Sequence, residues 1–288
     1  MDNIAEEMKH LNKLAKQHPG KRFDHLWEKI IHPLWLAQAW EQIRRNKGSQ
    51  SAGVDNTIAV DVDMSLIHKL ADELKSLAYR PKPVRRVYIP KANGKTRPLG
   101  IPTIKDRIVQ QALKMLLEPI FEADFRHCSH GFRPGRSPHT ALRDLVRVYA
   151  NTGYIIEGDI ESCYDNIPHS KLLQQVARRV SDKRTLSLIR AFLKAGYLQD
   201  WQYHRTYSGT PQGGIISPLL ANILLHQLDE FLIDELKANR GQTQKEVNSR
   251  RNPEYLRIND KIVRLRRKLK QGQEGGRKLI IEELVLQL

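Results

Sequence analysis

The sequence lacks the features of membrane, secreted and zinc-binding proteins. It contains no run of about 18 apolar residues, and residues 1–7 carry no basic-then-apolar signal pattern. It has only two cysteines, Cys128 and Cys163, with no Cys-x-x-Cys pair and no histidine cluster at zinc spacing. These absences favour a soluble, cytoplasmic protein without disulfides, structural zinc or a membrane partner.

Acidic residues are scarce relative to basic ones. The 48 lysines and arginines outnumber the 32 aspartates and glutamates, which gives a net charge of +16 and a pI near 9.9. The positive residues recur along the whole chain, so we expect a polyanionic partner, with nucleic acid as the leading candidate. A length of 288 residues allows roughly two domains and a sizeable core.

One stretch carries two carboxylates close together. The apolar, β-branched residues 154–159 predict a strand that ends at Asp159. A second acid, Asp165, follows before a helix expected after Pro168. An aspartate at a strand end is more often a turn former or a helix cap than a metal ligand, so neighbouring motifs must decide between these interpretations.

A hairpin is predicted where Asn93-Gly94 separates two alternating segments. A two-residue loop would point Lys91 away from Arg97. A three-residue loop with a left-handed Gly94 would pair Lys91 with Lys95 and place Lys91, Lys95 and Arg97 on one face. Spacing alone leaves both geometries open, and a solvated basic hairpin is the plain alternative.

Elsewhere the pattern favours helices with capped or broken ends. Thr103 has the spacing of a capping box, and its helix is expected to end at Glu118-Pro119. Ser137 and Pro138 begin another helix, and Ser217 with Pro218 caps and begins a third whose apolar stripe, through Leu228 and Phe231, is expected to be buried. Residues 201–207 alternate like a strand. The tryptophans near the start are interpreted as core: Trp27, Trp35 and Trp40.

Together these motifs resemble the reverse transcriptases encoded by group II introns, which also act as splicing maturases. The resemblance runs from about residue 36 to about residue 231. It rests on the Asp159 stretch, the hairpin of residues 87–102, Gly-Phe-Arg-Pro-Gly-Arg-Ser at residues 131–137 and Gly-Thr-Pro-Gln-Gly-Gly at residues 209–214. It implies an α+β fold of reverse-transcriptase fingers and palm with a helical N-terminal region, truncated before the Asp-Asp palm hairpin.

The resemblance implies a catalytic metal site at Asp159. Its carboxylate and the carbonyl oxygen of Ile160 would bind Mg²⁺, whereas Asp165 would be structural. The family's remaining metal carboxylates come from an Asp-Asp motif, and the sequence contains no Asp-Asp pair. We therefore expect the chain to be the N-terminal part of a longer protein and not to polymerise DNA alone.

The resemblance also implies a nucleotide site and an RNA surface. Lys91 and Arg97 would hold the triphosphate, which selects the three-residue hairpin loop. Tyr164 would pack on the sugar and exclude a 2′-hydroxyl, and Gln212 would lie beside the nucleotide. Candidate RNA contacts are Lys47, Arg85, Lys105, Arg107, Arg133 and Arg136. For these the alternatives are a plain connector at residues 46–55, solvent-facing Lys105 and Arg107 on the helix surface, and packing by Arg133 and Arg136.

The domain organisation follows the same comparison. We expect a helical N-terminal extension with an RNA-binding loop at residues 1–80, fingers at 81–150, a partial palm at 151–235 and a basic helical insertion at 236–288. The palm sheet would centre on residues 154–159. An incomplete palm is expected to expose apolar surface and to favour self-association, for example as a homodimer.

The function implied is that of an RNA-directed DNA polymerase and intron splicing maturase, present as an RNA-binding fragment. Its partners would be group II intron RNA, an RNA template, a DNA primer and dNTPs. Two alternatives remain open. One is a non-catalytic module that binds intron RNA and promotes splicing. The other is a reverse transcriptase of a retron or a diversity-generating element.

Overall fold

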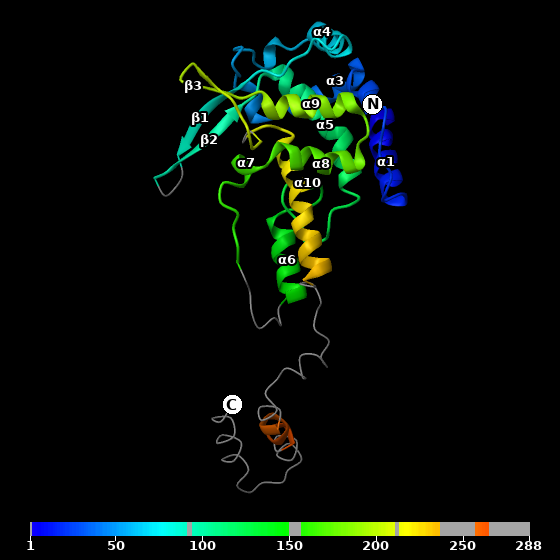
Figure 1. Cartoon of the computed structure of the whole chain (residues 1–288), viewed down its shortest axis with the longest axis vertical. Helices are drawn as coiled ribbons and strands as arrows, with labels where there is room; N and C mark the ends of the chain where they lie inside the picture. The colour runs from blue at the N-terminus through cyan, green and yellow to red at the C-terminus, as the bar shows by residue number, and fades with distance from the viewer. Residues whose placement is uncertain (1, 91–93, 150–156, 211–212, 237–256, 265–288) are drawn as a thin grey trace. The chain divides into compact units, whose positions relative to one another are not determined.

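The computed structural model describes residues 2–90, 94–149, 157–210, 213–236 and 257–264 (Figure 1). Contacts divide the chain into two units, Met1–Leu236 and Lys237–Leu288. In the second unit, residues 257–264 form a helix. All further description concerns the first unit. Among the described residues, no helix is long and apolar enough to cross a membrane.

The N-terminal helices pack around one central helix, α5 (Ile104–Phe121). They are α1 (Asp2–Gln17), α2 (Leu26–Ile30), α3 (Pro33–Arg44) and α4 (Met64–Lys75), and both α1 and α3 contact α5 extensively. Nearly every residue of α5 is buried, as expected of a helix enclosed on all sides. Trp27 and Trp35 are each 4% exposed, which confirms that they belong to the core.

The start of α5 was predictable, but its end was not. Asp106 N donates a hydrogen bond to Thr103 Oγ1 at 3.2 Å, which confirms Thr103 as the N-cap. The expected end at Glu118-Pro119 is wrong, because the helix continues through Pro119 to Phe121. Ile120 and Phe121 are 0% and 4% exposed, so their burial outweighs the hydrogen bond that proline cannot donate.

A four-stranded sheet carries the predicted hairpin. Its order is β2-β1-β3-β4, formed by β1 (Val84–Pro90), β2 (Thr96–Ile101), β3 (Tyr197–Gln199) and β4 (Gln202–His204). The β1–β2 pair is antiparallel, with Pro90 opposite Thr96 and Ile89 opposite Arg97. This register differs from the one that a two-residue loop would give, and Gly94 has the left-handed φ of 76° expected for the other geometry. Lys91 lies outside the described residues.

Half of the central strand expected at residues 154–159 lies outside the described residues, namely residues 154–156. Residues 157–160 are exposed and belong to no strand. A strand needs a hydrogen-bonded partner, and no described strand pairs with residues 157–160. The strand expected at residues 201–207 is shorter than predicted and spans only β4.

The rest of the first unit is helical: α6 (Pro138–Tyr149), α7 (Cys163–Asn166), α8 (His169–Arg179), α9 (Lys183–Lys194), α10 (Ser217–Glu230) and a π-helix, η3 (Phe231–Glu235). Ser137 Oγ accepts a hydrogen bond from Thr140 N at 3.3 Å, as expected of a cap for α6. The third helix begins at Ser217 itself, so Ile216 and not Ser217 is its cap.

An apolar surface remains exposed on α6 and at the end of α10, two segments that extend away from the sheet in Figure 1. Leu219, Leu220 and Ile223 of α10 are buried, but the expected burial of Leu228 and Phe231 is wrong, because they are 44% and 46% exposed. On α6 and after α10, the exposed apolar side chains also include Leu142, Leu145, Val146, Leu232 and Leu236. Such a patch is a candidate interaction surface.

Candidate nucleotide and nucleic-acid site

The Asp159 stretch leads into a short turn of helix at α7. Asp159 and Ile160 are exposed, whereas Tyr164 is half-buried and packs against the core. Burial, and secondarily the nearby Asp159 carboxylate, raise the pKa of the Cys163 thiol. Both Cys128 and Cys163 are free thiols. The exposed carboxylates of Asp159, Glu161 and Asp165 thus lie in the same stretch as the partly buried ring of Tyr164.

The glycine loop that follows β4 is anchored to the α7 turn. Gly209 N donates to Ile167 O at 2.8 Å, and Thr210 N donates to Tyr164 O at 2.8 Å. Gly209 has a φ of 87°, and a Cβ there would lie 2.8 Å from the carbonyl oxygens of Tyr164 and Asp165. Only glycine satisfies both the backbone angle and the close approach.

The other end of this loop is anchored to the hairpin and to α5. A Cβ at Gly213 would overlap the carbonyl oxygen of Gly100 on β2, and Ile215 N donates to Gln110 Oε1 at 2.8 Å. Gln212, the predicted nucleotide contact, lies outside the described residues. The loop's two described ends therefore bring the α7 turn and the hairpin together.

The hairpin presents basic side chains near this loop. Lys95 and Arg97 are both exposed, and Arg97 lies in β2. Arg97 lies opposite Ile89. Among the described residues, no hydrogen bond or ion pair engages the Arg97 guanidinium. A guanidinium in this state can donate to a ligand's phosphate oxygens.

Two predicted RNA contacts instead hold the N-terminal loop. Arg85 Nε and Nη2 donate to Ala52 O at 3.0 and 2.7 Å. Arg107 donates to Gly48 O at 2.7 Å and also to Ser51 O. The expectation that Arg107 is exposed is wrong: it is 7% exposed, because the carbonyls of the loop need buried donors.

Arg133 has a similar internal role. It is 7% exposed and donates to the Glu122 carboxylate at 2.6–3.2 Å and to the carbonyl oxygens of Arg126 and Ser129 at 2.7 Å. The packing alternative therefore describes Arg133. It fixes the connection between α5 and α6.

The remaining RNA candidates lie nearer the surface. Arg136 Nη1 donates to His127 O at 2.9 Å, and Lys105 Nζ lies 2.6 Å from Glu73 Oε1. Lys105 is thus paired and not freely solvated. Lys47 begins a short 3₁₀ helix, Lys47–Gln50, and its side chain lies outside the described residues. Contacts of these three residues with RNA stay predictions.

The described residues do not form a complete metal site. Within them, no group of three or more histidine, cysteine or acidic side chains is close enough to hold a metal ion. Asp159 offers a single exposed carboxylate, and one carboxylate does not fix a divalent ion without further oxygen ligands. No catalytic step through a metal follows from these residues alone.

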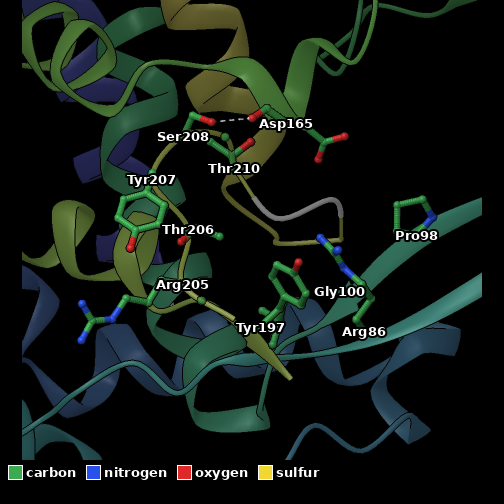
Figure 2. Close-up of a pocket in the computed structure, with 13 residues that line it drawn as sticks. Arg86, Pro98, Gly100, Asp165, Tyr197, Arg205, Thr206, Tyr207, Ser208 and Thr210 are labelled. Atoms are coloured by element: carbon green, nitrogen blue, oxygen red, sulfur yellow. Dashed lines mark hydrogen bonds between the residues drawn. The ribbon is translucent and has the colours of Figure 1, made fainter. Parts of the chain in front are cut away.

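The sequence patterns did not reveal a hollow on the other face of the hairpin (Figure 2). It has a volume of about 390 Å³, and Arg86, Tyr197, Tyr207 and Asp165 are among its lining residues. The Arg86 guanidinium carbon lies 3.4 Å from the centroid of the Tyr197 ring. Strand alternation alone would have predicted that Arg86 and Arg97 face opposite sides of the sheet. The hollow could not be predicted in this way, because residues 205–210, which are distant in sequence, form part of its lining.

Comparisons with known proteins show which proteins the sequence resembles. Residues 89–245 match the reverse transcriptase (RNA-dependent DNA polymerase) family. The group II intron-encoded protein LtrA of Lactococcus lactis subsp. cremoris is 41% identical over 277 residues, which cover 95% of this chain and 45% of LtrA. Protein YkfC of Escherichia coli K12 is 40% identical over 247 residues, which cover 83% of this chain and 65% of YkfC.

A solved structure is also similar. One chain of a partial Cas6-RT-Cas1–Cas2 complex aligns with a TM-score of 0.48 and 23% identity, over 74% of this chain and 35% of that chain. The present chain spans between 45% and 65% of the length of the two sequence relatives.

Proposed function

The chain belongs to the reverse transcriptase family, and from this we propose that it is the nucleotide-binding and template-binding part of a group II intron-encoded reverse transcriptase and maturase. The full-length protein would copy RNA into DNA from a DNA primer, using dNTPs. It would also bind its group II intron RNA and promote splicing. The family uses a divalent metal, and we propose Mg²⁺ as that ion.

The observation that carries this proposal is the loop anchored at Thr210 to Tyr164 and at Gly213 to Gly100. It joins the hairpin bearing Arg97 to the turn bearing Tyr164. A nucleotide needs cations at its triphosphate and a shaped contact at its sugar, held at a fixed separation. We assign the first to Arg97 with Lys91, and the second to Tyr164.

Asp159 and Ile160 complete the proposal on the metal side. The exposed Asp159 carboxylate and the Ile160 carbonyl would be two oxygen ligands of Mg²⁺, with Gln212 beside the bound nucleotide. The metal would neutralise charge on the triphosphate. The chain's own contribution is to orient these oxygen atoms next to the sugar contact.

The test is primer extension by a full-length protein that contains this chain, compared with its Asp159→Ala variant. We expect the variant to lose extension by at least about a thousandfold, since a metal ligand acts directly on the transferred phosphoryl group, while intron RNA affinity stays within about twofold. Extension that survives in the variant contradicts the assignment of Asp159.

We propose as a second function a non-catalytic module, which is favoured by the net charge of +16. A non-catalytic module would bind intron RNA and support splicing without copying it. The same experiment separates the two functions. If the unmutated full-length protein and its Asp159→Ala variant both promote splicing and neither extends a primer, the protein is the non-catalytic module.

A further inference from the structure

Trp201 occupies a position that the fold does not favour. Asp200 and Trp201 form the two-residue turn between β3 and β4, with φ angles of 49° and 62°. Left-handed angles at both positions favour glycine or asparagine, and a bulky side chain is strained there. The Trp201 side chain is also 86% exposed. Trp201 therefore stabilises the fold neither through its backbone conformation nor through burial of its side chain. This points to a role in binding and not in stability.

The residues that follow continue the same exposed pattern. Tyr203 is 52% exposed, Tyr207 is 82% exposed, and Arg205 between them is also exposed. The intervening Thr206 instead turns inward, where its hydroxyl donates to Leu193 O at 2.7 Å. Alternate residues therefore present two tyrosines and an arginine to solvent next to Trp201.

The segment 205–208 separates two hollows. The first, of about 390 Å³, is shown in Figure 2, where Tyr207 and Arg205 extend from this segment. The second, of about 670 Å³, lies on its other side and includes Tyr203 and the helix α9 in its lining. Planar groups on this segment thus have open space beside them.

The second hollow is basic. Arg190 and Lys194 of α9 line it together with Arg205, and no carboxylate does. In the described part of the chain, no ion pair or hydrogen bond engages any of these three side chains. The first hollow adds Arg86, and Asp165 is its one carboxylate. Cations beside exposed aromatic rings suit a ligand that has both phosphates and flat apolar rings.

The floor of the first hollow is already a stack of planar groups. Arg86 lies over the Tyr197 ring, and Tyr197 stacks on His204 with centroids 4.8 Å apart and planes 14° apart. These contacts fix the sheet surface from which Tyr203 and Arg205 extend. The exposed groups are therefore held on a rigid support.

The exposed rings and cations are different side chains from those assigned to the nucleotide. The first hollow nevertheless borders Asp165, Gly209 and Thr210, next to Tyr164. Arg86 pairs with Gly100 across the hairpin, whereas Arg97 pairs with Ile89, so Arg86 and Arg97 lie on opposite faces of the sheet. Oligonucleotide binding and dNTP binding are therefore measured side by side for each variant.

We propose that the Trp201 surface, which consists of Trp201, Tyr203, Arg205, Tyr207, Arg190 and Lys194, binds a single-stranded segment of nucleic acid. The rings stack on unpaired bases and the cations contact the phosphates that join them. A duplex hides its base faces and is not bound by stacking. This inference rests on the proposed function, because it assigns a second nucleic-acid contact to the same protein.

The test uses the 288-residue chain and fluorescent oligonucleotides of about 12 nucleotides: oligo(U), oligo(dT) and an RNA duplex. Combining Trp201→Gly with Tyr207→Ala should weaken oligo(U) binding at least about tenfold and change duplex binding less than about twofold. The single variant Trp201→Phe keeps an aromatic ring at this position and should retain most of the affinity of the unmutated chain for oligo(U). Trp201→Gly alone should leave the melting temperature unchanged or higher, because glycine accepts the left-handed turn.

The cations have a matched control on the same helix. Arg190→Gln with Lys194→Gln should weaken oligo(U) binding. The slope of log affinity against log salt concentration should fall by the amount that corresponds to about two phosphate contacts. Lys183→Gln with Arg184→Gln removes the same charge from the exposed start of α9 and should change binding by less than about twofold. Equal losses in both pairs would reduce the effect to net charge and overturn the proposal.

The outcomes separate this inference from the proposed function. If the Trp201→Gly and Tyr207→Ala variant binds oligo(U) like the parent chain, the surface is not a stacking site and the proposed function stands. If the chain binds the duplex as tightly as oligo(U), and the double substitution weakens both equally, stacking on unpaired bases is also refuted. If the parent chain binds no nucleic acid, the proposed function itself fails. The ratio of oligo(U) to oligo(dT) affinity identifies which strand the site prefers.

Discussion

The hydroxyl of Tyr79 donates a hydrogen bond to the carboxylate of Asp106 within the core. The two residues are 7% and 2% exposed. Burial raises the pKa of Asp106 to about 6, although hydrogen bonds from Tyr79, Thr103 and Lys82 N act in the opposite direction. A carboxyl group that titrates near neutrality inside the fold links stability to pH.

The free energy of unfolding should therefore depend on Asp106 between about pH 4 and pH 6. The folded state holds the proton more tightly than the unfolded state, so this stabilisation is complete below pH 3.8 and is lost as pH rises through about 6. The loss should be on the order of 3 kcal/mol. Urea unfolding of the parent and of Asp106→Asn measures it. The stability difference between the two should change with pH over that window, and a constant difference would contradict the prediction.

Substitution of Gly209 should destabilise the loop anchor. Gly209→Ala meets both the left-handed φ of 87° and the carbonyl oxygens of Tyr164 and Asp165, and we expect a loss of about 2–4 kcal/mol. Gly20→Ala is the matched control, because a Cβ there meets nothing within 4 Å. Thermal unfolding of the two variants checks this. Equal melting temperatures would mean that the loop does not make the close approach.

Arg97 and Arg107 should respond in opposite ways to the same substitution. Arg97→Gln should keep the melting temperature but weaken dNTP binding about tenfold, since its guanidinium is exposed and has no partner among the described residues. Arg107→Gln should cost about 2–3 kcal/mol of stability, because carbonyls of Gly48 and Ser51 lose buried donors. Calorimetric titration and thermal unfolding of each variant provide the comparison. A stability loss at Arg97 alone would reverse the two assignments.

The exposed apolar side chains of α6 and α10 should drive self-association. We expect the chain to form dimers at micromolar concentrations, and Leu145→Glu combined with Phe231→Glu to shift it to monomer. Val60→Glu, at an apolar residue that is 76% exposed elsewhere, should leave the equilibrium unchanged. Sedimentation velocity across a concentration series measures this, and a monomer at every concentration would refute it.

Local patterns predicted the features that depend on neighbouring residues. Asn93-Gly94 marked the position of the hairpin, although the choice of register came from the family resemblance. Thr103 marked the start of α5, because caps are settled within a few residues. The core positions of Trp27 and Trp35 followed from helical spacing in the same way.

The features that failed depend on residues far along the chain. Whether an arginine faces solvent depends on which carbonyls the tertiary fold leaves without donors, so the burial of Arg107 and Arg133 could not be read from their own helices and loops. Pro119 stays inside a helix because its neighbours are buried by distant segments. The strain at Trp201 was equally invisible, since alternation predicted a longer strand and no turn.

The loop between Thr210 and Gly213 sets a length scale. Its two described ends are anchored to the turn that we assign to the sugar and to the hairpin that we assign to the triphosphate. If these assignments hold, we expect an insertion or deletion between the two anchors to change substrate preference even when every contacting side chain is kept.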